Sequence, residues 1–249
     1  MRLSIIIITW DQKQHLVRCL QSLEQWYERN DTEIIVVDNG SCDGSSEYIE
    51  QHYPHIILIK NKVNTGVSHA RNQGMRKAKG NYLLFLDNDT VVPYESVEGM
   101  LHYIEGHPDV GICACNLVYE DGSPQYNFKP YPGLFFKVKR FLRMKSASVS
   151  YYVPVDGIVE PCYVIGACQM VSRHAMEVVG CYDENIFYGP EDTDYCMRMH
   201  QNGFKVIGLT DYQITHYCRR LTNHSLFSKL SLKHICSLFY LYYKYHRIF

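Results

Sequence analysis

An apolar run that ends abruptly in acidic residues is the feature that most constrains this 249-residue chain. Residues 83–86 read LLFL, which predicts a strand buried on both faces. Asp87 and Asp89 follow directly and bracket Asn88. In open α/β sheets, ligands bind in the crevice outside the carboxyl ends of the strands. Two carboxylates there are oxygen ligands of the kind that Mg²⁺ and Mn²⁺ prefer, although Asp and Asn are also ordinary turn residues.

Similar apolar runs precede this one, at residues 3–9, 33–38 and 55–60, and polar residues gather where each run ends. Segments with helical spacing separate the runs, so strand and helix alternate. Short connections of this kind favour parallel βαβ units with right-handed crossovers. The polar residues should therefore meet at one edge of a single sheet, a coincidence that core packing does not require.

Each helix between these strands has its own signal. The first is expected where apolar residues recur at helical spacing, at Leu16, Leu20, Leu23 and Tyr27. The second follows a Gly/Ser-rich turn, with Asp43 or Ser45 as its N-cap. The third should end at Gly80, directly before the acidic strand.

Length and composition exclude several classes of protein. The length fits one α/β domain, and the net charge of −1 with no long basic run argues against a nucleic-acid surface. The N-terminal apolar run is too short for a signal peptide and lacks a cleavage site. We therefore expect a cytoplasmic protein whose ten cysteines are reduced thiols.

Several motifs occur in an order that resembles family 2 glycosyltransferases of the GT-A fold. The segments TWDQKQHLVRCLQSL, VVDNGSCDGS and NTGVSHARNQGMRKAKGNYLLFLDNDT resemble the nucleotide-binding half of that family. The segment GACQMVSRHAMEVVGCYDENIFYGPEDTDYCMRMHQNGFKV is similar to its acceptor half. The match covers most of residues 3–216, and the bacterial rhamnosyltransferase-like members look most similar.

The resemblance implies a fold and an activity. The fold would be a Rossmann-like, mixed but mainly parallel sheet flanked by helices, over residues 1–222, with the two halves meeting near residue 118. The activity would be inverting, metal-dependent transfer of a sugar from a dTDP- or UDP-sugar. The acceptor would be a hydroxyl of a glycan or lipid-linked glycan in cell-surface polysaccharide synthesis.

By the same resemblance, the nucleotide is held at the strand ends and at the start of the third helix. The implied donor-site residues are Thr9, Trp10, Asp11, Asp38, Gly66, Arg71, Asn72, Asp87 and Asn88. Asp38 would accept a hydrogen bond from the base or ribose, because a buried carboxylate is costly without a partner; alternatively it caps the turn that follows. Arg71 is either a donor contact or a solvated helix residue.

The resemblance also implies a metal site for Mn²⁺ or Mg²⁺. Asp89 would bind the ion directly, and Asp87 would contact the ribose or reach the ion through water. His216 matches a histidine that closes the site from the opposite side, and imidazole suits Mn²⁺ better than Mg²⁺. The alternative for His216 is a packing or surface role in a strand.

The segment YGPEDTDYCMRMHQNG predicts a turn and then a helix with Glu191 and Asp192 in its first turn. The helix dipole favours carboxylates there, so capping alone would explain them. The resemblance implies that Asp192 is the general base and that Glu191 orients it or holds the acceptor hydroxyl. Gly166 and Ala167 would line the acceptor side, or simply allow close strand packing.

Two segments lie outside these motifs. Residues 119–159 form an aromatic and basic insertion expected to cover the site, to order on donor binding, or to contact a lipid-linked acceptor. Residues 223–249 predict an amphipathic helix that lysines interrupt too often for a membrane span. That helix either lies at the inner face of the cytoplasmic membrane, or packs on the domain or on a second subunit.

Two other functions remain open from the sequence. A sugar nucleotidyltransferase also uses a strand-end aspartate and a metal, but it usually carries a glycine-rich loop after the first strand, where this chain has TWDQKQ. A non-catalytic sugar-binding or scaffold protein could keep the fold. The joint presence of Asp38, Asp87, Asp89, Asp192 and His216 argues against a protein that has lost its catalytic residues.

Overall fold

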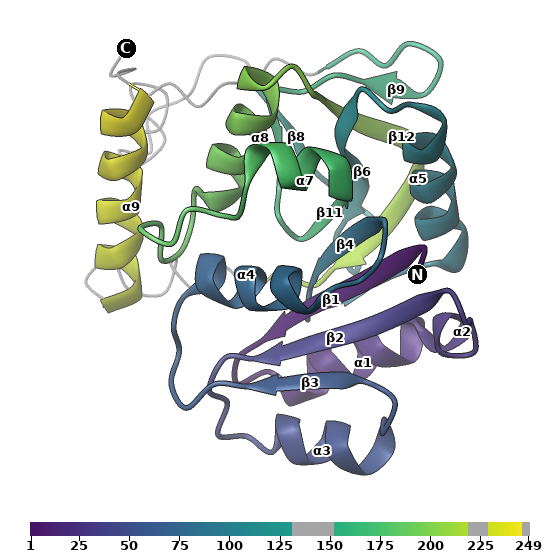
Figure 1. Cartoon of the computed structure of the whole chain (residues 1–249), viewed down its shortest axis with the longest axis vertical. Helices are drawn as coiled ribbons and strands as arrows, with labels where there is room; N and C mark the ends of the chain where they lie inside the picture. The colour runs from purple at the N-terminus through teal and green to yellow at the C-terminus, as the bar shows by residue number, and fades with distance from the viewer. Residues whose placement is uncertain (131–151, 219–228, 246–249) are drawn as a thin grey trace.

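The structure is a computed structural model, and it describes residues 1–130, 152–218 and 229–245 (Figure 1). Its first half contains four parallel strands in the order β3-β2-β1-β4. They are β1 (Leu3–Thr9), β2 (Thr32–Asp38), β3 (Ile57–Lys60) and β4 (Tyr82–Asp87). The helices between them are α1 (Lys13–Ser22), α2 (Glu24–Tyr27), α3 (Ser45–His52) and α4 (Val67–Lys77). The alternation predicted from the apolar runs is therefore confirmed.

The helix boundaries differ from the predictions in three places. The first predicted helix is two helices, because the chain breaks at Leu23, although Leu16, Leu20 and Leu23 are all buried as expected. Gly44 occupies the N-cap position of α3, while the Asp43 carboxylate accepts the backbone N–H groups of Lys13 and Ser45. Helix α4 ends at Lys77 rather than at Gly80.

The second half continues the same sheet. Its elements are β5 (Thr90–Val91), α5 (Tyr94–Gly106), β6 (Val110–Val118), β7 (Pro124–Gln125), β8 (Phe128–Lys129), β9 (Ile158–Val159), β10 (Tyr163–Val164), β11 (Cys168–Ser172), α7 (Arg173–Val179), α8 (Glu191–Gln201) and β12 (Lys205–His216). Strand β11 lies between β4 and β6 and is antiparallel to both. The main sheet is therefore mixed, as expected, and runs through both halves, while β8 and β10 pair in a separate two-stranded sheet.

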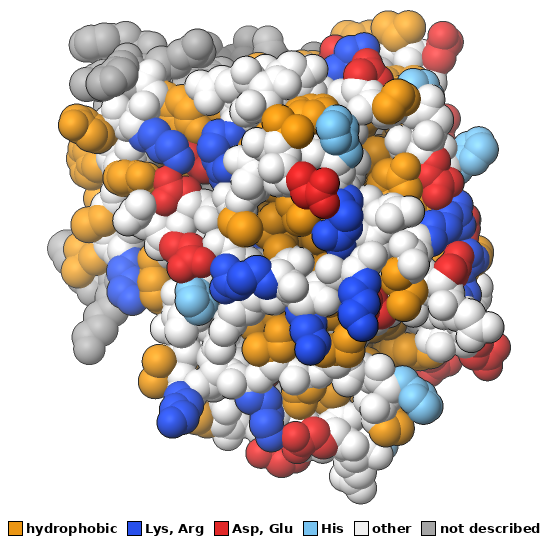
Figure 2. Space-filling model, viewed as in Figure 1, with side chains coloured by type: hydrophobic (Ala, Val, Ile, Leu, Met, Phe, Trp, Pro, Cys, Tyr) orange, Lys and Arg blue, Asp and Glu red, His pale blue; other side chains and the backbone are white. Residues whose placement is uncertain are grey.

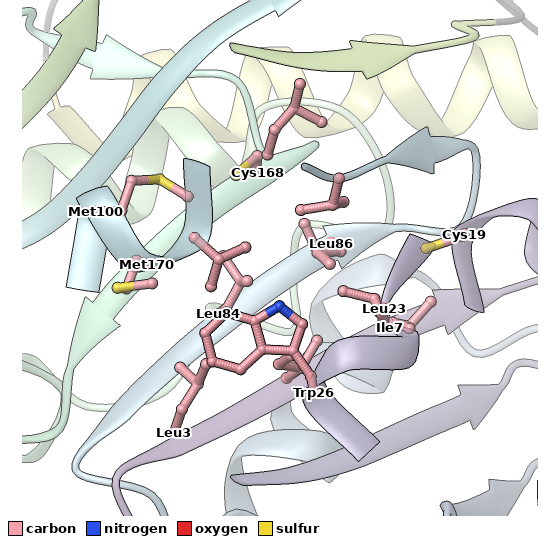
Figure 3. Close-up of a cluster of buried hydrophobic side chains, with 14 of the residues drawn as sticks. Leu3, Ile7, Cys19, Leu23, Trp26, Leu84, Leu86, Met100, Cys168 and Met170 are labelled. Carbon is pink, nitrogen blue, oxygen red and sulfur yellow. The ribbon is translucent and has the colours of Figure 1, made fainter. Parts of the chain in front are cut away.

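Helices cover both faces of this sheet, with a hydrophobic core on each side. Alternate residues of β1 point to opposite faces: Ile7 packs in the core beneath α1, α2 and α5, and Ile6 in the core beneath α4, α7 and α8. Figure 3 shows the first core, where Trp26 lies against side chains from β1 and β4. Fully buried strands of this kind explain the nearly continuous apolar runs.

The parallel register places the polar strand ends together. Thr9 pairs with Asp38 across β1 and β2, and Ile8 pairs with Asp87 across β1 and β4. Strand β12 runs as one long strand, with an irregular register between Leu209 and Gln213, and brings His216 beside Thr90 of β5. The chemistry-bearing residues therefore converge at one edge, as the strand pattern predicted.

The C-terminal helix α9 (Lys229–Tyr245) packs at the side of the second half, next to α8 (Figure 1). Among the described residues, no helix combines the length and the apolar character that crossing a bilayer requires. Of the 119–159 insertion, the middle part (131–151) lies outside the described residues, and so does the expectation that it covers the site.

Candidate active site

A cavity of about 380 Å³ opens at this edge of the sheet. Most of the residues predicted to form a site line it together. They are Thr9, Trp10, Gly66, Arg71, Asp87, Asn88, Asp89, Gly166, Ala167, Glu191, Asp192 and His216. The strand ends of the first half and the start of α8 thus face one space, which supports one shared site rather than separate polar turns.

Three possible metal ligands lie on one side of the cavity. One ligand atom from each of Asp87, Asp89 and His216 lies within 4.8 Å of the other two. His216 Nε2 is 3.3 Å from Asp89 Oδ1. Burial opposes protonation of His216, but the neighbouring Asp89 carboxylate outweighs it and raises the histidine pKa. Two carboxylates and one imidazole form a donor set that suits Mn²⁺, and also Mg²⁺ through the oxygens, so the residues present fit the implied ion.

Gln125 fixes the orientation of His216. Its Nε2 donates to the backbone carbonyl oxygen of His216 at 2.6 Å, and its Oε1 is 2.9 Å from His216 Nδ1. A carbonyl oxygen only accepts, so the amide NH₂ must face it and the amide oxygen must face the ring. His216 Nδ1 therefore carries a proton, and Nε2 is the nitrogen that faces Asp89.

Arg71 links the metal side of the cavity to the acidic pair. This side chain is 2% exposed, which excludes the solvated alternative. Its guanidinium donates to the carbonyl oxygen of Gly166 at 2.9 Å and lies 3.5 Å from Asp87 and 3.3 Å from Glu191. One buried cation thus lies between carboxylates from two different motifs.

Glu191 and Asp192 begin helix α8, at the N-terminal end predicted for them. Glu191 accepts the backbone N–H of Gly189 at 2.8 Å. Asp192 accepts the N–H of Gly166 through Oδ2 at 3.1 Å, while its Oδ1 accepts the N–H of Thr193. Burial raises the pKa of Glu191 to about 7, with Asp192 adding to the shift and Arg71 opposing it. The pair therefore combines a fixed carboxylate with one that titrates near neutrality.

The space beside each of the two predicted glycines is occupied by a side chain of the protein itself. A Cβ on Gly166 would lie 2.5 Å from the Arg71 guanidinium. Gly66 has a φ of +92°, and a Cβ there would lie 2.8 Å from Phe187. Both glycines line the cavity, but their missing side chains are explained by these two neighbours.

Three predicted donor-site residues do not line the cavity. The Asp38 carboxylate accepts the N–H of Ser41 and the hydroxyl of Ser46, which matches the turn-capping alternative. Asn72 bonds Tyr182 and Glu184, so it joins α4 to the second half. Asp11 accepts the N–H of Cys42 and tightens the loop after β1.

Other residues complete the wall without having been predicted. Asn39 directly follows β2, and its side chain binds Asn64 and the carbonyl oxygen of Gly66. A polar residue at a strand end is a signal that could have found it. Tyr188 and His234 also line the cavity, and Gln125 supports it, but no local pattern marks any of the three.

Comparisons with known proteins identify a family for this chain. The model of "Glycosyl transferase family 2" matches residues 4–154, and that of "Glycosyl transferase family group 2" matches residues 82–247. An uncharacterized glycosyltransferase of Haemophilus influenzae is 35% identical over 47% of this chain and 41% of its own length. The poly(ribitol-phosphate) beta-glucosyltransferase of Bacillus spizizenii is 31% identical over 52% of this chain and 21% of its own. The matches thus cover less than half of these relatives.

Solved structures show the same fold. TarS of Staphylococcus aureus (residues 1–349) superposes with a TM-score of 0.64 at 18% identity, over 87% of this chain and 60% of that one. GalNAc-T7, solved with UDP, GalNAc and Mn²⁺, superposes with a TM-score of 0.68 at 18% identity, over 88% of this chain and 44% of that one. The fold is that of the GT-A enzymes. With a family model matching more than half of its length, the chain belongs to glycosyl transferase family 2.

Proposed function

We propose that this enzyme transfers one sugar, with inversion at the anomeric carbon, from a nucleoside diphosphate sugar to an acceptor hydroxyl. The observation that carries the proposal is the single cavity in which Asp87, Asp89 and His216 lie together with Glu191 and Asp192. One group suits a divalent cation and the other suits proton removal. A transfer from a diphosphate to a hydroxyl needs both.

In this proposal Asp87, Asp89 and His216 hold Mn²⁺ or Mg²⁺. When bound, the ion neutralises the charge that develops on the departing nucleoside diphosphate. Thr9, Trp10 and the loop at Gly66 contact the nucleoside, since they line the cavity at the ends of the first strands. The Asn88 side chain donates to the Thr9 hydroxyl at 2.8 Å and keeps this part of the wall fixed.

Asp192 is the proposed general base. The acceptor oxygen bonds to the anomeric carbon as the bond to the diphosphate oxygen breaks, and the hydroxyl proton passes to Asp192. The N–H of Gly166 holds Asp192 Oδ2 in place. Glu191, tied to Arg71 and Gly189, orients the acceptor. A Glu191 pKa of about 7 also suits proton removal, so the two carboxyl groups must be tested separately.

The donor and acceptor classes rest on the names of related proteins. Two relatives are named for poly(ribitol-phosphate) glycosyl transfer, and solved neighbours carry UDP, UDP-GlcNAc or GDP-Man. These names support a nucleoside diphosphate sugar donor, which we propose to be a UDP-sugar or, as the sequence resemblance implies, a dTDP-sugar. The proposed acceptor is a glycan or lipid-linked glycan in cell-surface polymer synthesis, at the cytoplasmic side of the membrane. The rhamnosyltransferase-like assignment stays a prediction of the sequence.

The test measures release of nucleoside diphosphate from a panel of UDP-, dTDP- and GDP-sugars with Mn²⁺, for the wild type, Asp192→Asn and Glu191→Gln. Asp192→Asn should lower turnover at least about a hundredfold with nucleotide affinity unchanged. Glu191→Gln should lower the rate of this release less than Asp192→Asn does, because Glu191 orients the acceptor and does not remove its proton. If Asp192→Asn keeps full turnover, Asp192 is not the base and Glu191 takes that role. If the wild type turns over no donor, the scaffold alternative is favoured.

A further inference from the structure

Helix α9 is held firmly by its inner face. Leu241 and Tyr242 are buried there. Lys244 Nζ lies 2.6 Å from Asp183 Oδ2 and 2.7 Å from Asp194 Oδ1, and Asp194 is fully buried. Ion pairs with one buried and one half-buried carboxylate fix the rotation of the helix about its axis, so its opposite face points outward.

That outward face carries a row of apolar side chains. Leu232, Phe239 and Tyr243 are 52%, 65% and 76% exposed, and Cys236 is exposed between them. Their spacings of four, three and four residues place them in one line along the helix. Figure 2 shows hydrophobic side chains along the edge of the molecule where α9 lies. Single exposed apolar residues are ordinary, whereas a continuous row marks an interaction surface.

The charge of this end of the chain selects the kind of partner. Six of the 25 lysines and arginines, and none of the 26 acidic residues, lie after residue 218. Lys233 is exposed on the flank of the helix, where its Nζ lies 3.3 Å from the centroid of the Phe187 ring. Helices with an aromatic and aliphatic face and only basic charges adsorb in the interface of anionic membranes.

A second copy of the chain fits this surface less well. Stable interfaces bury roughly 800 Å² on each partner and involve about 20–30 residues a side. The row on α9 comprises four side chains. A symmetric pair would also bring two basic ends of the chain together, and of their six basic residues Lys244 is the one whose pairing with Asp183 and Asp194 is described above.

The same helix contributes to the catalytic cavity. His234 lines the cavity, and its Nδ1 is 3.2 Å from the carbonyl oxygen of Tyr188. His234 belongs to the inner side of α9, so a bilayer against the outer side would lie about one helix diameter, roughly 10 Å, from the cavity wall. We propose that Leu232, Cys236, Phe239 and Tyr243 dock on an anionic lipid surface and present the cavity to lipid-linked acceptors, which rests on the proposed function.

The test is co-sedimentation of the full chain with vesicles of phosphatidylcholine alone or with 30% phosphatidylglycerol. The test variant is Phe239→Ser/Tyr243→Ser, whose side chains are exposed and whose replacement should leave the fold intact. The control is Val153→Ser/Val178→Ser, which removes two exposed apolar side chains elsewhere. Nucleotide binding and donor hydrolysis are measured on every protein in parallel.

The wild type and the control should bind the anionic vesicles, more weakly as salt rises, and Phe239→Ser/Tyr243→Ser should lose at least about tenfold in affinity. Equal binding by all three proteins, or no binding by the wild type, would contradict the proposal that this row docks on lipid. If the wild type and the control form a dimer and Phe239→Ser/Tyr243→Ser does not, the row binds a second copy of the chain and not a lipid surface. Vesicle binding without any nucleotide binding would instead refute the proposed function and leave the surface standing.

Discussion

Gln125 binds both the backbone carbonyl and the imidazole ring of His216, at 2.6 and 2.9 Å. The pairing crosses 91 positions of sequence and is buried. Because one amide satisfies both groups, the ring is held in a single tautomer whose Nε2 faces the Asp87 and Asp89 carboxylates.

Gln125→Leu should therefore weaken Mn²⁺ binding by about 10–100-fold, since the ring loses the partner that sets its tautomer and direction. Manganese titration followed by electron paramagnetic resonance measures the affinity without any substrate. Gln213→Leu, at an exposed position three residues before His216, is the matched control and should bind Mn²⁺ normally. Equal affinity in the two variants would remove Gln125 from the metal site.

Deprotonation of the buried Glu191 carboxyl group should lower the free energy of unfolding as pH rises. Its pKa is about 7 in the fold against a usual 4.5, so the unfolded chain releases the proton first. The stabilising contribution of the protonated form is complete below pH 4.5 and is lost as pH rises through 7. Glu191→Gln has no such group to titrate. The free energy of unfolding of this variant, relative to that of the wild type, should therefore rise between pH 5 and 7 and stay constant above pH 7.

Urea unfolding at pH 5, 6, 7 and 8 measures this difference. Glu177→Gln, at an exposed position of α7, is the control and should follow the wild-type profile. A constant offset between the wild type and Glu191→Gln across this range would show that the Glu191 carboxyl does not titrate there.

Arg71→Met should destabilise the protein by about 3–5 kcal/mol, because Asp87 and Glu191 would lose the buried cation between them. Adding Glu191→Gln should recover part of the loss at pH values above 7, where Glu191 is ionised and would otherwise be an uncompensated carboxylate. Arg76→Met on the same helix removes an exposed contact with Glu184 and should cost under about 1 kcal/mol. If urea unfolding finds equal costs for the two arginines, the buried link is unimportant.

Lys244→Met should loosen helix α9 and cost about 1–3 kcal/mol, because Asp194 has no exposed surface and Asp183 is largely covered. Burial opposes ionisation of Asp183, but hydrogen bonds from Lys244, Asn185 and Tyr240 outweigh it and lower its pKa to about 2. Its contribution is present above about pH 4 and is lost as pH falls through 2.

Hydrogen exchange of α9 reports the loosening directly. Amides of the helix should exchange faster in Lys244→Met than in Lys205→Met, which removes an exposed pair with Asp109. Equal protection of α9 in both variants would mean that the helix is held by its apolar contacts alone.

Much of the first half was predictable because its signals are local. The four parallel strands follow from apolar runs, and their polar ends meet because parallel register aligns them. The insertion of β11 between β4 and β6 was not predictable from the sequence, because it depends on pairing between residues far apart in the chain, such as Met170 and Leu84. The break at Leu23 and the end of α4 at Lys77 are boundary details that tertiary contacts decide.

The site divides in the same way. The acidic strand end and the start of α8 are visible as sequence patterns. For Arg71 the sequence leaves two roles open, a donor contact or a solvated helix residue, and its burial between two carboxylates excludes the second. For Asp38 the structure shows the turn-capping role, because its oxygens accept hydrogen bonds from Ser41 and Ser46, and the contact with the nucleoside stays a prediction. Partners supplied from distant segments, such as Gln125, leave no local pattern.

The most direct test of the account is calorimetric titration of UDP, dTDP, GDP and CDP into the wild type and Asp89→Asn, each with Mn²⁺ and with EDTA. UDP or dTDP should bind the wild type with Mn²⁺, and EDTA or Asp89→Asn should weaken this binding at least about tenfold. Binding of the same strength in all conditions, or no binding of any nucleotide, would contradict a metal-assisted nucleotide-sugar site at Asp87, Asp89 and His216.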